Sequence, residues 1–125
     1  MVSQQEIDNY VETFQKTYET LFKAQKIDEL IQLYHPQAAF VQAGIVGVIG
    51  QKAIQEKLEP FAQRGVVFSL TTTRNLIAGP NAEFIIHEGT YTSEALNGKV
   101  QPYLQIFKKV ENGKYVIYHN EYTFN

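Results

Sequence analysis

The chain has 125 residues, a formal net charge of −2 and 44% hydrophobic residues, including eight tyrosines and eight phenylalanines. This length predicts a single domain, residues 1–125, with a sizeable apolar core. The 11 basic residues are scattered, which argues against nucleic acid as a partner. There is no cysteine, no secretory signal and no apolar run near the roughly 20 residues of a membrane span, so we expect a cytoplasmic protein with no membrane partner.

The N-terminal half of the sequence predicts three helices. In residues 4–23, apolar side chains recur every three or four positions, which indicates an amphipathic helix. Asp28 is a candidate N-cap for a short second helix, which Pro36 ends because its ring excludes a helical hydrogen bond. A third helix is indicated by Ile54 and the apolar positions after it, and we expect Pro60 to kink or close that helix.

The remaining segments predict strands. Residues 38–43 indicate a brief strand, and the glycine-rich stretch 44–50 indicates a bent apolar loop or tight hairpin. Further on, the apolar period changes to two and predicts an antiparallel meander of four strands, separated by Gly-Pro-Asn or Asn-Gly turns. These strands cover residues 66–78, 82–94, 99–110 and 114–124. Helices followed by strands indicate the α+β class, with the helices on one face of the sheet.

Alternation divides the last three strands into two faces. One face is mainly apolar and consists of Ile85, His87, Tyr91, Leu104, Ile106, Tyr115, Ile117 and His119. The other face is mixed and consists of Phe84, Ile86, Glu88, Thr90, Thr92, Gln101, Tyr103, Gln105, Phe107, Val116, Tyr118, Asn120 and Tyr122. Neither face is polar enough to face water, so we expect the helices to cover the mixed face over a polar-dotted cavity and a second copy to cover the apolar face. The alternative is a β-bulge that reverses one strand and exposes its polar groups.

The segment LIQLYHPQAAFVQAG, the following GQKAIQEKL and the closing YVIYHNEYTFN resemble the nuclear transport factor 2-like superfamily, especially its SnoaL-like and ketosteroid isomerase-like branches. The resemblance spans nearly the full chain. It implies the cone-shaped, cystatin-like fold, in which three N-terminal helices pack on a curved antiparallel sheet. It also implies a conical pocket between helices and sheet, and a homodimer formed through the outer sheet face.

The catalytic residues of that superfamily can be assigned to this chain only by comparing matching positions one at a time. Where the ketosteroid isomerases have a carboxylate base this chain has Gln42, and where they have a protonated carboxylic acid it has Gln105. An amide cannot abstract a proton, so we do not expect steroid isomerisation by that mechanism, and whether the chain is an enzyme stays open. Tyr18 corresponds to their oxyanion-binding tyrosine; the alternative is a core tyrosine whose hydroxyl reaches a partner at the rim.

We expect a domain that holds a small, largely apolar molecule in a conical pocket. The candidate ligand-binding residues are Tyr18, Tyr34, Gln42, Glu88, Tyr103, Gln105, Asn120 and Tyr122. Glu88 is the candidate catalytic residue if the chain is a SnoaL-like isomerase, cyclase or dehydratase, and the alternative places it, solvated, at an open rim. The remaining alternative is a non-catalytic homodimerisation or adaptor module.

No metal or cofactor is expected, because His35, His87 and His119 lack the spacing of metal ligands. His35 is better placed to cap the end of the second helix. His119 and Glu121 share a strand face two residues apart, where we expect a hydrogen-bonded pair at the dimer interface.

Overall fold

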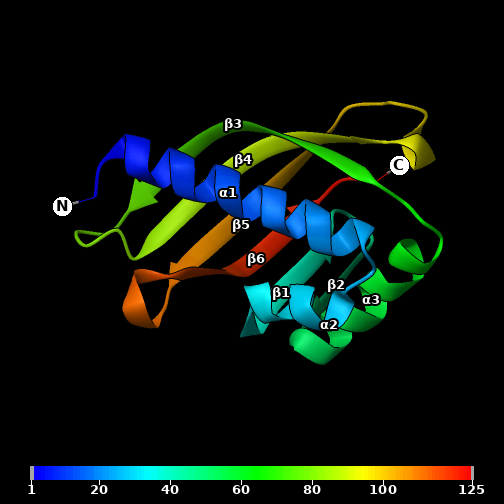
Figure 1. Cartoon of the computed structure of the whole chain (residues 1–125), viewed down its shortest axis with the longest axis horizontal. Helices are drawn as coiled ribbons and strands as arrows, with labels where there is room; N and C mark the ends of the chain where they lie inside the picture. The colour runs from blue at the N-terminus through cyan, green and yellow to red at the C-terminus, as the bar shows by residue number, and fades with distance from the viewer. Residues whose placement is uncertain (1, 125) are drawn as a thin grey trace.

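The computed structural model describes residues 2–124 and shows helices packed on one side of a sheet of six strands (Figure 1). The helices are α1 (Gln4–Lys23), α2 (Ile27–Leu30) and α3 (Gln51–Gln63), with short 3₁₀ segments η1 (Ile31–Leu33), η2 (Glu94–Leu96) and η3 (Glu111–Gly113). The strands are β1 (Tyr34–Gln42), β2 (Val46–Ile49), β3 (Phe68–Ala78), β4 (Phe84–Ser93), β5 (Gln101–Lys109) and β6 (Tyr115–Tyr122). Their order is β2-β1-β6-β5-β4-β3, and every pair is antiparallel except β1 and β6. The α+β prediction is confirmed, with the difference that the sheet is mixed.

α1 begins and packs as its sequence predicts. Ser3 and Glu6 form a reciprocal capping box: the Ser3 hydroxyl accepts from the Glu6 amide at 3.1 Å, and the Glu6 carboxylate accepts from the Ser3 amide at 3.3 Å. The buried stripe of the helix includes Ile7, Phe14 and Tyr18. In Figure 1 this helix crosses in front of the sheet, whereas α2 and α3 lie beside β1 and β2. None of the helices within residues 2–124 combines the length and the apolar character of a membrane span.

The second helix differs from its prediction. It begins at Ile27, so Asp28 lies in its first turn instead of capping it, and Lys26 provides no side-chain cap. The helix passes into η1, and Tyr34 already belongs to β1. Pro36 therefore lies in a strand, at a point where the pairing of β1 with β6 is interrupted. A proline fits there because it lacks the amide that a regular ladder needs.

The hairpin and the third helix follow their predictions. β2 pairs with β1 from Ala39 opposite Ile49 to Gln42 opposite Val46, which makes the glycine-rich stretch a hairpin. α3 continues for three residues past Pro60, so this proline lies in the last turn and closes the helix without breaking it.

The prediction for the two faces of β4 is wrong. Ile85 lies opposite Phe107, and His87 lies opposite Gln105, so all four side chains share the helix-covered face. Tyr91, opposite Gln101, follows the same alternation. The connection between β4 and β5 contains η2 instead of a two-residue turn, so the register of these strands could not be derived from a turn type.

β6 contains the bulge that was the alternative in the sequence analysis. Phe107 lies opposite Ile117 and Ile106 lies opposite His119, so Tyr118 is the extra residue. The bulge reverses the alternation, and Ile117 and Asn120 both face the helices. The polar Asn120 therefore stays inside. From the sequence, a bulge was expected to expose such polar side chains to solvent.

These registers also change the set of residues available for a dimer. Ile85 and Ile117 were expected at the interface, but both are 0% exposed in the core beneath the helices. Leu104 and Ile106 do lie on the outer face, because they alternate with the buried Tyr103 and Gln105.

Candidate ligand-binding site

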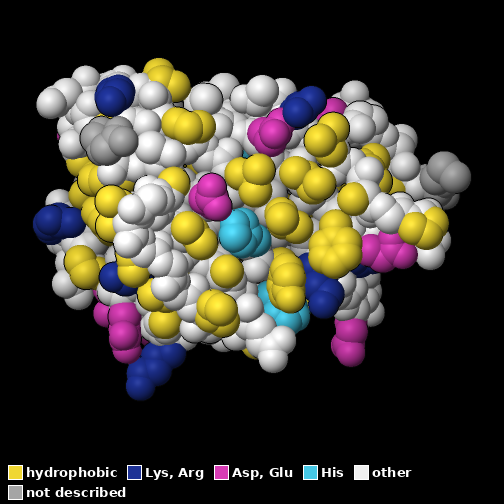
Figure 2. All heavy atoms as spheres, turned by 180° about the vertical axis from the view of Figure 1, so that it is seen from behind, with side chains coloured by type: hydrophobic (Ala, Val, Ile, Leu, Met, Phe, Trp, Pro, Cys, Tyr) yellow, Lys and Arg dark blue, Asp and Glu magenta, His cyan; other side chains and the backbone are white. Residues whose placement is uncertain are grey.

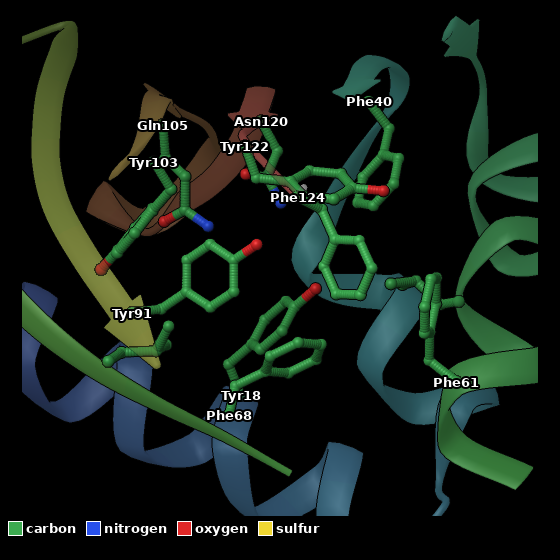
Figure 3. Close-up of a pocket in the computed structure, with 12 residues that line it drawn as sticks. Tyr18, Phe40, Phe61, Phe68, Tyr91, Tyr103, Gln105, Asn120, Tyr122 and Phe124 are labelled. Carbon is green, nitrogen blue, oxygen red and sulfur yellow. The ribbon is translucent and has the colours of Figure 1, made fainter. Parts of the chain in front are cut away.

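A small cavity of about 70 Å³ lies between the helices and the inner sheet face (Figure 3). Its walls are mostly aromatic. The lining residues are Tyr18, Phe40, Leu58, Phe61, Phe68, Leu70, Tyr91, Tyr103, Gln105, Asn120, Tyr122 and Phe124. They come from α1, α3, five strands and the segment after β6, so the cavity exists only when the whole sheet and its helices are assembled.

A chain of three polar side chains reaches one side of this cavity. Asn120 Nδ2 donates to the Tyr34 hydroxyl at 2.9 Å, and the hydroxyls of Tyr34 and Tyr18 are 2.7 Å apart. Either hydroxyl can be the donor in this pair. When Tyr34 donates to Tyr18, the Tyr18 O–H is left to donate toward the cavity. Figure 3 shows the Tyr18 hydroxyl pointing into the cavity.

The Tyr18 hydroxyl is neutral at ordinary pH. Burial, followed by the proximity of Tyr34, raises the pKa of Tyr18 well above its usual value. Burial also raises the pKa of Tyr34. Tyr18 can therefore donate a hydrogen bond to a ligand oxygen, but it does not supply a negative charge.

Gln105 contributes a second donor. Gln15 on α1 donates through Nε2 to Gln105 Oε1 at 2.6 Å, and both side chains are buried. This bond occupies the Gln105 carbonyl and turns its amide nitrogen toward the cavity, as Figure 3 shows. The Gln15 oxygen itself is buried and has no partner within the described residues.

A second polar chain runs behind the cavity wall. His87 Nε2 lies 2.7 Å from the Tyr103 hydroxyl, and His87 Nδ1 lies 2.6 Å from Asn75 Oδ1. Asn75 Nδ2 donates to Asp8 at 3.0 Å, so the Asn75 oxygen must accept from His87 Nδ1–H. His87 Nε2 then accepts from the Tyr103 O–H. Burial lowers the pKa of His87 to about 4, which keeps the imidazole neutral.

Glu88 does not line the cavity, contrary to expectation. It lies opposite Leu104 on the outer sheet face, where it forms an ion pair with Arg74. The hydrogen bond from Arg74 lowers the pKa of the Glu88 carboxyl. Glu88 was expected at the cavity because the two faces of β4 were assigned the wrong way round. The alternative, in which Glu88 is solvated, describes its position better.

The other expected residues divide into two groups. Tyr18, Tyr103, Gln105, Asn120 and Tyr122 are brought together as lining residues. Two others support the cavity without lining it. Tyr34 is the middle member of the Asn120–Tyr18 chain, and Gln42 lies at the end of β1, where it donates to the Phe124 carbonyl at 3.3 Å.

Most residues of the aromatic wall were not predicted from the sequence. Tyr91 was assigned to the outer face, and no periodicity pointed to Phe124, which lies beyond the last strand. Phe61 and Phe68 lie in segments that were predicted as a helix and a strand, but neither was expected at the site. The one available signal was composition, since eight tyrosines and eight phenylalanines are more than a few core positions require.

The outer face carries the remaining histidines. His119 Nε2 lies 3.4 Å from Glu121 Oε1, and the two residues share a face as expected. His35 contacts the ring of Tyr118, and its Nδ1 accepts from the Gln37 amide at 3.0 Å, so it caps the backbone of β1 and not a helix end. Within residues 2–124, no group of three or more His, Asp or Glu side chains is placed to hold a metal ion.

Comparisons with known proteins identify the architecture. The sequence matches no family model and no curated protein. Among solved structures, a proposed dehydratase of the nuclear transport factor 2-like family from Streptomyces avermitilis has a TM-score of 0.78 at 10% identity, covering 97% of both chains. This chain has the nuclear transport factor 2-like fold. A proposed scytalone dehydratase from Novosphingobium aromaticivorans has a TM-score of 0.76 at 15% identity, covering 98% of this chain and 87% of that one.

A further structure with the nuclear transport factor 2-like fold belongs to a protein of a different kind. It is a proposed calcium/calmodulin-dependent protein kinase II association domain from Xanthomonas campestris, with a TM-score of 0.72 at 15% identity, covering 92% of this chain and 85% of that one. Dehydratases and an association domain therefore share this architecture. At these identities the similarity concerns the fold, and function must be argued from the site.

Proposed function

We propose that this nuclear transport factor 2-like domain binds a small, flat aromatic molecule that carries a hydrogen-bond acceptor such as a ketone oxygen. The observation that carries the proposal is the neutral Tyr18 hydroxyl, which points into a cavity with aromatic walls. Apolar walls with a few convergent polar groups are typical of small-molecule sites. The Gln105 amide nitrogen lies on the same cavity and supplies a second donor.

The lining residues favour binding over acid–base catalysis. None of the 12 lining residues has a carboxylate, an imidazole or an amine. His87 lies behind this wall, and its two nitrogens are occupied by Asn75 and Tyr103. A general base must be within hydrogen-bond reach of the proton that it removes. An isomerase, cyclase or dehydratase that uses Glu88 is therefore not supported, because Glu88 lies on the opposite face.

A matched pair of ligands tests the proposal. 2-Acetylnaphthalene and 2-ethylnaphthalene have nearly the same shape, but only the ketone has an acceptor oxygen. We expect the protein to bind the ketone more tightly than the hydrocarbon in an NMR titration. Tyr18→Phe should lower the ratio of the two affinities about tenfold, which is equivalent to one hydrogen bond. Equal affinities for the two compounds in the native protein would contradict the proposed role of Tyr18.

We also propose that the outer sheet face forms a homodimer. Figure 2 shows hydrophobic side chains spread over the face behind the helices, with histidines among them. Leu76 is 40% exposed and Tyr118 is 36% exposed, and Leu104 and Ile106 are half-buried on the same face. Exposed apolar side chains gathered on one face are typical of an interface between protein chains. A cytoplasmic homodimer with one ligand in each protomer is the assembly we propose, and analytical ultracentrifugation at micromolar concentration tests the dimer.

A further inference from the structure

The cavity is too small for the ligands proposed above. Its volume is about 70 Å³, whereas an engineered apolar cavity of roughly 150 Å³ holds benzene and pockets for drug-sized molecules measure roughly 300–1,000 Å³. A bicyclic aromatic molecule therefore binds only if part of the wall moves away. Of the lining residues, Phe124 alone lies outside every helix and strand.

Most polar members of the wall are fixed by buried hydrogen bonds. Tyr18 and Asn120 are both joined to Tyr34, and Gln105 is joined to Gln15. Tyr18 and Asn120 are each only 7% exposed, and Gln105 is 4% exposed. Moving any of them would leave a buried polar partner unsatisfied, which is costly.

Phe124 is held more loosely than these residues. It lies beyond the end of β6 at Tyr122, belongs to no helix or strand, and is only half-buried. Its ring has an edge contact with Phe61, with 5.7 Å between centroids. Figure 3 shows this ring between Tyr18, Tyr122 and Phe61, where it forms part of the cavity wall.

The backbone around Phe124 is held by three hydrogen bonds to neighbouring elements. The Tyr91 hydroxyl donates to the Thr123 carbonyl, and Gln42 Nε2 donates to the Phe124 carbonyl at 3.3 Å. The Thr123 amide donates to the Pro102 carbonyl at 3.2 Å. The segment thus places one aromatic ring and two acceptor oxygens against the site.

We propose that Thr123 and Phe124 act as an internal ligand that closes the site, and that an aromatic ketone binds by displacing them. Tyr91 and Gln42 are then released to donate to an acceptor on the incoming molecule, which makes them specificity residues for its second polar group. The inference rests on the proposed function. It adds the route by which the ligand enters and the residues that select it.

Closure of this kind lowers the apparent affinity of the native protein. A ligand that binds only the open state has its dissociation constant increased by the inverse of the open fraction. Removing the Phe124 ring enlarges the cavity and removes the aromatic part of the internal ligand, while the two backbone carbonyls remain. We therefore expect Phe124→Ala to bind both naphthalenes at least about fivefold more tightly than the native protein does, and Val110→Ala, a change at the far end of the sheet, to leave both affinities unchanged.

Hydrogen exchange provides a readout that does not depend on affinity. The Thr123 amide is protected by its bond to Pro102, and displacement of the segment breaks that bond. We expect saturation with 2-acetylnaphthalene to accelerate exchange at Thr123 about tenfold, while exchange within β5 stays unchanged.

Tyr91→Phe in the Phe124→Ala background tests selection by Tyr91. We expect the double variant to keep its affinity for 2-acetylnaphthalene, whose one oxygen is bound at Tyr18, and to lose about tenfold for 2-acetyl-6-hydroxynaphthalene, which has a second polar group. Native binding with unchanged Thr123 exchange, or equal affinities of native protein and Phe124→Ala, would overturn the internal-ligand proposal while the proposed function stands. Absence of binding by both proteins would overturn both.

Discussion

The hydroxyls of Tyr18 on α1 and Tyr34 on β1 lie 2.7 Å apart in the interior, and Asn120 on β6 donates to Tyr34. This contact joins the first helix to the two strands that pair in parallel, and the Tyr18 hydroxyl points into the cavity. The same network therefore contributes both to the stability of the fold and to the proposed recognition of a ligand oxygen.

We expect Tyr34→Phe to lower the free energy of unfolding by about 1–3 kcal/mol, because it leaves the buried Asn120 and Tyr18 groups without their common partner. Urea denaturation measures this loss. Tyr118→Phe is the matched control, since Tyr118 is 36% exposed, and we expect it to change stability by less than about 0.5 kcal/mol. Equal effects of the two substitutions would show that the buried network adds nothing.

His87 should make stability fall in mildly acidic solution. Burial lowers its pKa to about 4 from 6.5, so the unfolded chain binds a proton in this range before the folded one does. The stabilisation is complete above pH 6.5 and is lost as the pH falls toward 4, by about 3 kcal/mol at about 1.4 kcal/mol per pKa unit.

The measurement is the difference in pH dependence of urea unfolding between the native protein and His87→Gln, which lacks this titration. NMR of the imidazole nitrogens gives a second check, since we expect Nδ1 to carry the proton and Nε2 to accept from Tyr103. An imidazole with an ordinary pKa would contradict the buried position of His87.

Gly89 on β4 leaves room for the ring of Tyr103. A Cβ atom at Gly89 would lie 2.6 Å from the Thr71 carbonyl oxygen and 2.7 Å from a carbon of the Tyr103 ring. We expect Gly89→Ala to cost about 1–3 kcal/mol in unfolding free energy through overpacking and to weaken binding at the cavity that Tyr103 lines. Gly47→Ala is the control, because its nearest contact would be an ordinary 3.6 Å to Val41. The prediction fails if both variants are equally stable.

We expect Glu88→Gln to leave ligand affinity unchanged. It should alter the pH dependence of unfolding only through the loss of one exposed ion pair. The carboxylate faces away from the cavity, and an exposed pair with Arg74 contributes little. Titration of the variant with 2-acetylnaphthalene measures this, with Tyr18→Phe as the variant that does lose affinity. A loss of affinity in Glu88→Gln as large as that in Tyr18→Phe would show that Glu88 belongs to the binding site.

Ile106→Lys should convert the proposed homodimer into a monomer, because it places a charge in the centre of the apolar outer face. Sedimentation velocity measures the change in mass, and circular dichroism checks that the fold is retained. Lys114→Glu is a control that changes charge on an exposed loop outside this face. A native protein that sediments as a monomer would remove the dimer proposal.

The fold was largely predictable because its signals are local. The stripe on α1, with Phe14 and Tyr18 at its centre, follows from helical periodicity, and the inner face of β5, with Tyr103 and Gln105, follows from strand alternation. The candidate site was predictable only in part. Alternation states which residues of one strand share a side, but not which side the helices cover.

The sequence by itself determined the α+β class, the amphipathic first helix and the tyrosine- and glutamine-bearing face of β5, since each depends on a period of a few residues. Tertiary structure decided the rest through contacts between distant segments. The register across η2 turned His87 inward and Glu88 outward, and the bulge at Tyr118 kept Asn120 inside. Packing of the segment after β6 placed Phe124 in the cavity, because its position depends on partners in α3 and β1 that no local pattern encodes.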